Sequence, residues 1–387
     1  MGTDVIDRLL EETVEKGDVP GVVAIAGTAD GVTYHGAFGH RAVDNRVPMT
    51  TDTVFWIASM TKAVTSVAAM QLVEQGRLQL DEPIGRVLPE LTTVKVLEGF
   101  SESGEPRYRT PKRPITLRHL LTHTAGFTYD MWNADMMCYM ERAQIPNIIE
   151  CKNITLSTPL VFDPGDRWEY GINIDWVGKA VEVVSGRSLQ DYLKENAFTP
   201  LRMEDTGFRI PDGARSRLAA MHQRGEDGTL TRIDFEVPQD PEFFMGGAGL
   251  YSTGTDYLKF TQMLLHEGMA NGTRILQSET VQMMRRNHIG SLNVRPMKSA
   301  IAAVTNDGEF FPGMEKKWGL GFMINMEDAP TGRRAGSLAW AGLANTYFWI
   351  DPVERVTGII LTQIFPFADP KVLDLFAKFE TQIYQLR

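Results

Sequence analysis

The sequence predicts an α+β fold: an antiparallel β-sheet flanked by helices, with an inserted helical domain. Near the N-terminus, apolar runs at residues 21–27 and 32–39 are separated by an Asp-Gly turn, which is typical of a hairpin. Near the C-terminus, short runs have the character of strands, at residues 320–326, 344–350 and 356–363. Between these ends strand signals are sparse and helical patterns dominate. We therefore expect a sheet domain built from residues 1–80 and 200–387, interrupted by a helical domain at residues 81–199.

Helices are expected where apolar residues recur every three or four positions. The first spans residues 3–16 and ends at Gly17. The same kind of pattern predicts further helices, at residues 115–123, 189–198, 255–268, 278–284 and 373–386. Thr116 is the expected N-cap of the second of them. Two segments, 99–114 and 285–315, lack a clear period and are expected to be loops.

The composition narrows the possible functions. The chain has 387 residues, of which 43% are hydrophobic and 23% charged, as in ordinary globular proteins. Its net charge of −10 argues against nucleic acid or an anionic membrane as partner. No apolar run is long enough to span a membrane, and the acidic, amphipathic start is unlike a signal peptide, so we expect a cytoplasmic location. Cys138 and Cys151 are expected to be free thiols, and the oligomeric state is not indicated.

Ser59 precedes the segment around which the chain is organised. An apolar run at 55–58 leads to this serine, and an almost wholly apolar helix follows, as in a helix buried in a core. An N-cap role would explain Ser59 but not Lys62, because a cation in the first turn opposes the helix dipole. A serine with a lysine three residues later is instead the pairing of a nucleophile with an amine base. The tetrapeptide is a modest signal alone, so it needs supporting motifs.

Other candidate sites are weaker. His119 and His123 have the spacing of a two-histidine metal site, but no glutamate follows His119 and no further cluster supplies ligands, so we predict no metal. The chain also has no phosphate-binding loop, dinucleotide fingerprint or Gly-x-Ser-x-Gly elbow, and no cofactor is predicted. Taken alone, Tyr170 and Trp340 are expected to be packed aromatic residues.

The order of these motifs resembles the serine β-lactamase and penicillin-binding protein superfamily. Ser59 to Lys62 is followed by Tyr170 and, near the C-terminus, by Trp340-Ala341-Gly342. Further segments match in the same order: 120–127, 164–165, 246–253 and 318–322. Within the superfamily, the chain looks most like the family VIII carboxylesterases, which are related to class C β-lactamases. The resemblance implies an antiparallel sheet flanked by helices plus a helical domain, in agreement with the pattern above.

Two departures from the superfamily motifs bear on the substrate. Class C enzymes carry Tyr-x-Asn, whereas Ile172 occupies the third position here and Asn173 comes one residue late. Penicillin-recognising members carry Lys-Thr-Gly where this chain has Trp340-Ala341-Gly342. Tryptophan offers an apolar face and one N–H donor but no cation for the carboxylate of a β-lactam. The departure therefore favours an apolar acyl ester over an anionic substrate.

The resemblance implies roles for particular residues. Ser59 would attack the ester carbonyl and form an acyl-enzyme, with Lys62 and Tyr170 sharing the work of general base. The backbone N–H groups of Ser59 and Leu343 would form the oxyanion hole. Asn173 would orient Tyr170, and Tyr129 and Trp132 belong to a Met-rich run that either lines the entrance or packs as a helix. The expected substrate-binding residues are Trp340, Gly342, Asn173, Tyr129 and Trp132.

The leading functional hypothesis is a serine carboxylesterase that hydrolyses a small-molecule ester with a short acyl chain. A second hypothesis is an enzyme of the same fold with another activity: a β-lactamase, a D-amino-acid peptidase or an acyltransferase. A third is a non-catalytic binding protein, against which the presence of Ser59, Lys62 and Tyr170 together argues.

Overall fold

The computed structural model describes residues 3–210 and 212–386 and centres on an antiparallel, seven-stranded sheet. In sequence order its strands are β1 (Gly21–Thr28), β2 (Gly31–Gly39), β11 (Lys316–Trp318), β12 (Met323–Asn325), β13 (Leu338–Gly342), β14 (Thr346–Asp351) and β15 (Val356–Leu361). In space the order is β11-β12-β13-β14-β15-β1-β2. Strand β1 pairs with β15, with Val23 opposite Leu361, so the two ends of the chain close one sheet. This arrangement confirms the predicted fold class.

Helices cover both faces of the sheet. On one face α1 (Asp4–Glu15) packs beside α10 (Pro370–Gln385), and on the other α8 (Gly254–Leu265) crosses β1 and β15. Successive residues of β14 show the two sides: Phe348 contacts Tyr257 of α8, whereas Trp349 contacts Phe379 of α10. Because both faces are covered, β13, β14 and β15 are buried along their whole length.

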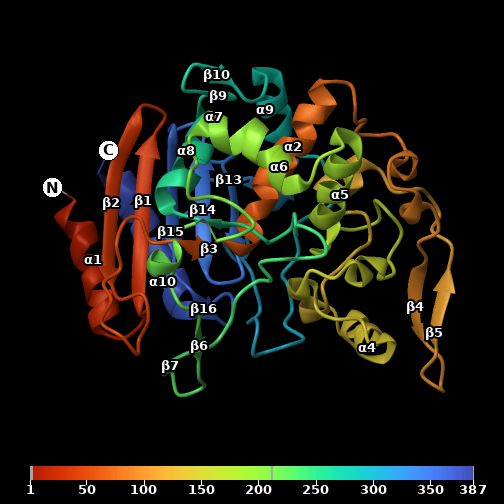
Figure 1. The fold of residues 1–387 in the computed structure, drawn as a ribbon, viewed down its shortest axis with the longest axis horizontal. Coiled ribbons are helices and arrows are strands. Elements are labelled where there is room, and N and C mark those ends of the chain that lie inside the picture. The colour runs from red at the N-terminus through yellow and green to blue at the C-terminus, as the bar shows by residue number, and fades with distance from the viewer. Residues whose placement is uncertain (1–2, 211, 387) are drawn as a thin grey trace.

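The helical part lies beside the sheet and is centred on α2 (Thr61–Glu74) and α5 (Asn173–Ser185), which pack together. In Figure 1 the N- and C-terminal labels lie at the sheet end, and the hairpin of β4 (Val96–Phe100) and β5 (Pro106–Arg109) lies at the other. The remaining helices are α3 (Leu117–Leu121), α4 (Ala134–Ala143), α6 (Leu189–Leu193) with a π-helical extension (Lys194–Phe198), α7 (Thr199–Leu201) and α9 (Ser278–Met284). Short 3₁₀ turns occur at Ala58–Met60, Ile84–Arg86, Pro89–Thr92, Asp130–Trp132, Ile148–Glu150, Asn153–Ser157 and Arg215–Arg217.

The minor strands pair outside the central sheet. They are β3 (Phe55–Trp56) with β8 (Tyr251–Ser252), β4 (Val96–Phe100) with β5 (Pro106–Arg109), β6 (His222–Arg224) with β7 (Leu230–Arg232) and β16 (Ile364–Phe365), and β9 (Met269–Ala270) with β10 (Thr273–Arg274). The β3–β8 pair matters for function, since it ties the strand before Ser59 to the segment after Gly247.

Two expectations about local structure are corrected. Segment 99–114 is not simply a loop, because β4 and β5 form a hairpin there. Val96 and Leu97 at the start of β4 are buried, whereas the rest of the hairpin is half-buried or exposed. The polar strand β5 joins β4 partly through the ion pair between Arg109 and Glu98 (3.0 Å), so it has no apolar run that a sequence pattern could reveal. Strand β11 was not predicted, because it carries two lysines, Lys316 and Lys317, which are buried. The domain boundaries at 80/81 and 199/200 stay a prediction.

Other elements agree with the sequence patterns. Helix α2 is buried from Thr61 to Leu72, as its apolar composition predicts. Thr116 caps α3: its hydroxyl accepts from the His119 amide (3.2 Å), and the His119 ring accepts from the Thr116 amide (3.2 Å). None of the helices in residues 3–210 and 212–386 has the length and apolarity that crossing a membrane requires.

Candidate active site

Ser59 lies in the 3₁₀ turn that leads into α2, and it is half-buried. It is not an N-cap, since its hydroxyl lies 3.0 Å from the Lys62 amine. The preceding residue, Ala58, has a φ of 44°, a left-handed conformation that a residue with a Cβ adopts only when its surroundings impose it. The backbone therefore holds the serine in a sharp, strained turn beside the lysine.

Lys62 is fully buried and contacts three groups. Its Nζ lies 3.0 Å from the Ser59 hydroxyl, 3.0 Å from the Tyr129 hydroxyl and 2.7 Å from the Gly247 carbonyl oxygen. Burial lowers the pKa of Lys62 to about 7, and attraction to the Asp175 carboxylate opposes that fall. An amine with such a pKa is partly neutral at neutral pH, so it can accept a proton from Ser59.

Asp175, on α5, is a fully buried acid that the sequence analysis did not single out. Its Oδ1 accepts from the Gly247 amide at 2.8 Å, and the carbonyl of the same glycine accepts from Lys62. A Cβ at Gly247 would lie 2.6 Å from the Asp175 carboxylate, so only glycine fits between the two. Burial raises the pKa of Asp175, whereas Lys62 and the Gly247 amide lower it. Asp175 and Lys62 thus form a buried charge pair bridged by one glycine.

Tyr170 is buried against Ser59 and Lys62. Its hydroxyl accepts from the Trp340 indole N–H at 2.8 Å, and Lys62 Nζ is 4.5 Å from the centre of its ring. Burial raises the pKa of Tyr170, whereas the hydrogen bonds with Ser59 and Trp340 lower it. The structure thus brings Ser59, Lys62 and Tyr170 together.

Trp340 lies on β13 and is almost fully buried. Its indole N–H donates to the Tyr170 hydroxyl at 2.8 Å, and its expected contact with the substrate stays a prediction. The cation of the Lys-Thr-Gly motif is thus replaced by a neutral donor that positions Tyr170.

Replacing Trp340 with phenylalanine is expected to lower kcat about tenfold while leaving KM nearly unchanged, because Tyr170 loses one hydrogen bond and the aromatic surface remains. Steady-state hydrolysis of a p-nitrophenyl ester measures both constants. Trp132→Phe is the matched control, since the Trp132 N–H donates to the Thr305 hydroxyl (3.2 Å) instead. A rise in KM alone would show that Trp340 acts on the substrate and not on Tyr170.

The other predicted substrate-binding aromatics, Tyr129 and Trp132, lie beside Tyr170. Tyr129 is nearly buried, and its hydroxyl contacts Lys62, so it belongs to the proton network more than to an entrance. Trp132 is half-buried, with its ring centre 5.4 Å from that of Tyr170. In the Met-rich run, Met136 and Met140 lie on the buried face of α4. Their burial favours packing of the helix over an exposed lining of the entrance.

Asn173 is fully buried behind Tyr170. Its amide nitrogen lies 3.1 Å from His123 Nδ1 and donates to the Phe127 carbonyl at 3.3 Å. The His123 ring centre is 4.7 Å from that of Tyr170, so His123 lies between Asn173 and the tyrosine. The role of Asn173 in orienting Tyr170 stays a prediction. Burial and the nearby Lys62 lower the pKa of His123 well below its usual value, and the ring is neutral.

The predicted oxyanion hole involves the end of β13. Gly342 lies against the turn before Ser59, and a Cβ there would be 2.3 Å from the Ile57 carbonyl oxygen. The same carbonyl accepts from the Thr346 hydroxyl at 3.2 Å. These contacts hold Leu343, the next residue, near Ser59. The roles of the Ser59 and Leu343 amides stay a prediction.

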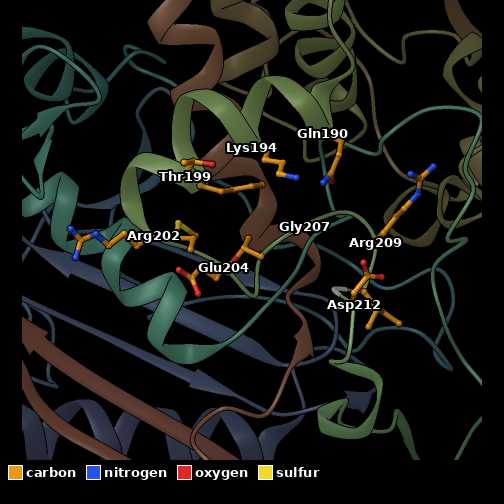
Figure 2. A pocket seen from close by; sticks show the side chains of 12 residues that line it. Gln190, Lys194, Thr199, Arg202, Glu204, Gly207, Arg209 and Asp212 are labelled. Atoms are coloured by element: carbon orange, nitrogen blue, oxygen red, sulfur yellow. The ribbon is translucent and has the colours of Figure 1, made fainter.

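Two hollows of the protein lie away from Ser59. One hollow of about 640 Å³ lies beneath α6 and its π-helical extension. Figure 2 shows side chains of both charge signs around it, including Lys194, Glu204 and Arg209. Ser59 is not part of this lining. Within the described part of the chain, no group of three His, Cys, Asp or Glu side chains could hold a metal ion.

A serine paired with a buried lysine and tyrosine, where a helix-covered antiparallel sheet meets a helical block, defines a serine enzyme of the β-lactamase and penicillin-binding protein fold. The beta-lactamase family model matches residues 6–382, and the chain belongs to this family. The resemblance inferred from the motifs is therefore confirmed.

Relatives extend over the whole chain. Monacolin J acid methylbutanoyltransferase of Aspergillus terreus is 34% identical, over 98% of this chain and 95% of the relative. Lovastatin esterase of Penicillium rubens is 30% identical, over 98% of both chains. Simvastatin synthase from Aspergillus terreus, solved without ligand, superposes with a TM-score of 0.87 at 34% identity, covering 99% of this chain and 98% of that one. The chain is an enzyme of this serine hydrolase-like fold.

Proposed function

We propose that the protein is an acyltransferase, which moves a short acyl group from an ester donor to the hydroxyl of an apolar small molecule through an acyl-enzyme on Ser59. The observation that carries this proposal is the 3.0 Å contact between the Ser59 hydroxyl and the buried Lys62 amine. In its neutral form this amine donates its two protons to Gly247 and Tyr129 and accepts the proton of Ser59.

The first half-reaction acylates Ser59. Its Oγ attacks the ester carbonyl carbon while the proton passes to Lys62, and the backbone amides of Ser59 and Leu343 stabilise the oxyanion. The bond between the carbonyl carbon and the ester oxygen then breaks. Lys62 gives up the proton it took from Ser59, and the leaving oxygen receives it by way of the Tyr170 hydroxyl.

The second half-reaction repeats these steps with an acceptor. An acceptor hydroxyl gives its proton to the same base and attacks the acyl carbon, which releases the new ester and restores Ser59. Aromatic rings of Tyr129, Trp132 and Trp340 surround Tyr170. Apolar surface here lets an organic acceptor use binding energy to compete with water for the acyl-enzyme. The names of the methylbutanoyltransferase and simvastatin synthase relatives support acyl transfer over plain hydrolysis.

Product partitioning tests the proposal. With p-nitrophenyl butyrate as donor and monacolin J acid as acceptor, p-nitrophenolate, free butyrate and the new ester are measured together. We expect the share of ester to rise with acceptor concentration until it exceeds free acid, because acceptor and water compete for one acyl-enzyme. If free butyrate accounts for all the p-nitrophenolate at every acceptor concentration, even across a panel of apolar alcohols, the protein is an esterase.

Hydrolysis is the second candidate, supported by the name of the lovastatin esterase relative and by the half-exposed Ser59. It was the leading hypothesis from the sequence, and it differs from transfer only in the molecule that accepts the acyl group. β-Lactamase activity is disfavoured, since Trp340 supplies no cation. A cytoplasmic location, the absence of nucleic-acid partners and the finer likeness to family VIII esterases stay predictions.

A further inference from the structure

A second cavity, separate from the surroundings of Ser59, lies between the sheet and α10. Its volume is about 320 Å³, at the lower end of the range of about 300–1,000 Å³ for small-molecule sites. Ala339 of β13 and Tyr347 of β14 line one side, Phe376 and Ala377 of α10 line another, and the loop at 309–312 lies at the rim. Trp340 also borders the cavity and separates it from Tyr170.

The walls are mostly aromatic. The ring of Tyr347 stacks on Phe376 with centres 5.0 Å apart, and Phe310 lies 6.2 Å from Tyr347 and 5.7 Å from Trp340. Such walls bind apolar molecules by removing apolar surface from water. These aromatic walls have no polar groups that could replace the water around a strongly hydrated ligand.

One end of the cavity is polar but has no net charge. Arg333 and Glu380 are each about 1% exposed and form a two-fold ion pair, with the arginine Nε and Nη2 each 2.7 Å from a carboxylate oxygen. The Thr331 hydroxyl donates to the same carboxylate at 2.9 Å. Within the described residues the remaining nitrogen of Arg333, Nη1, has no hydrogen-bond acceptor. The polar end thus presents the two unpaired N–H groups of Arg333 Nη1, on a guanidinium whose charge Glu380 neutralises.

The rim holds a strained aromatic residue. Phe311 has a φ of 47°, which is rare for a bulky side chain and requires surroundings that impose it. Its ring lies over the Arg333 guanidinium, 5.0 Å from ring centre to Cζ. Phe311 is half-buried and the next residue, Pro312, is exposed, so the cavity meets solvent at this point.

We infer that this cavity binds a neutral, apolar small molecule with one hydrogen-bond-accepting oxygen, such as a medium-chain aliphatic alcohol. The chain lies among Phe310, Tyr347 and Phe376, and the oxygen accepts from Arg333 Nη1. An anion is disfavoured because Glu380 already neutralises the guanidinium. The site is distinct from the proposed acyl transfer at Ser59 and does not depend on it.

Binding is tested by calorimetry with 1-octanol in a Ser59→Ala background, where no acyl-enzyme forms. Ala377→Leu fills the cavity and is expected to weaken binding at least about tenfold, whereas Lys378→Leu, on the exposed face of α10, leaves it unchanged. Leu373→Phe fills the same cavity if Ala377→Leu fails to fold. 1-Bromo-octane, which lacks the oxygen, is expected to bind about tenfold more weakly.

A crystal soaked with an octanol brominated at its far end locates the ligand. We expect the bromine signal between Phe310 and Phe376 and the hydroxyl at Arg333. Equal affinity in the parent and both cavity-filling variants, or bromine found only beside Ser59, would overturn the inference. Either result would leave the acyl-transfer proposal intact, since binding is read without catalysis.

Discussion

Replacement of Ser59 by alanine is expected to lower kcat for p-nitrophenyl ester turnover about a thousandfold or more, because the acyl-enzyme can no longer form. Lys62 and Tyr170 keep their positions in this variant, so substrate binding is expected to survive. Steady-state kinetics and intact-mass spectrometry measure the two consequences. The wild type should gain the mass of one acyl group on brief exposure to the ester, and the variant should not.

The matched control is Ser66→Ala. Ser66 lies on the same helix, α2, and is fully buried, but it has no contact with Lys62 among the hydrogen bonds of the described residues. Its replacement should leave kcat within about twofold, because no reacting group is removed. Retained turnover in Ser59→Ala would place the nucleophile elsewhere and overturn the site as described.

Part of the site follows from the sequence. Lys62 breaks a local rule, since a cation in the first turn of an apolar helix is unfavourable, and that conflict points to chemistry at Ser59. Tyr170 and Trp340 are not unfavourable in their local sequence context, so nothing local indicates a catalytic role for them. They could be assigned only through the order of motifs in a known family.

The rest of the site depends on contacts that no local pattern contains. Tyr129 is 67 residues and Gly247 185 residues from Lys62 in sequence, and the fold alone brings their oxygens to its amine. From the sequence, Asp175 is an ordinary acidic residue in the first turn of a helix. Only the structure shows that it is buried beside Gly247. For the fold, apolar runs predicted buried strands near both chain ends, whereas the hairpin of β4 with the polar β5 and the lysine-containing β11 were not predicted.

The pH profile is expected to report Lys62. Below its pKa of about 7 the amine is protonated and cannot take the Ser59 proton, whereas above that pH it is a base. We therefore expect log kcat/KM to rise with pH through the acidic range and level off above about 7. Lys62→Met should lower kcat by about 10²–10⁴-fold, because the general base is lost. Any residual activity of this variant should no longer rise with pH through the acidic range, which is the acidic limb of the profile.

Asp175→Asn tests whether the charge of Asp175 determines the pH at which the acidic limb of the profile lies. Asparagine can still accept from the Gly247 amide, but it removes the negative charge that holds the pKa of Lys62 up against burial. The Lys62 pKa should fall further, and the acidic limb of the profile should move to lower pH. Asp163→Asn is the control, since that buried carboxylate pairs with Arg109 and Lys112 instead. A limb that stays in place or moves to higher pH in Asp175→Asn would show that Lys62 is not the group that titrates.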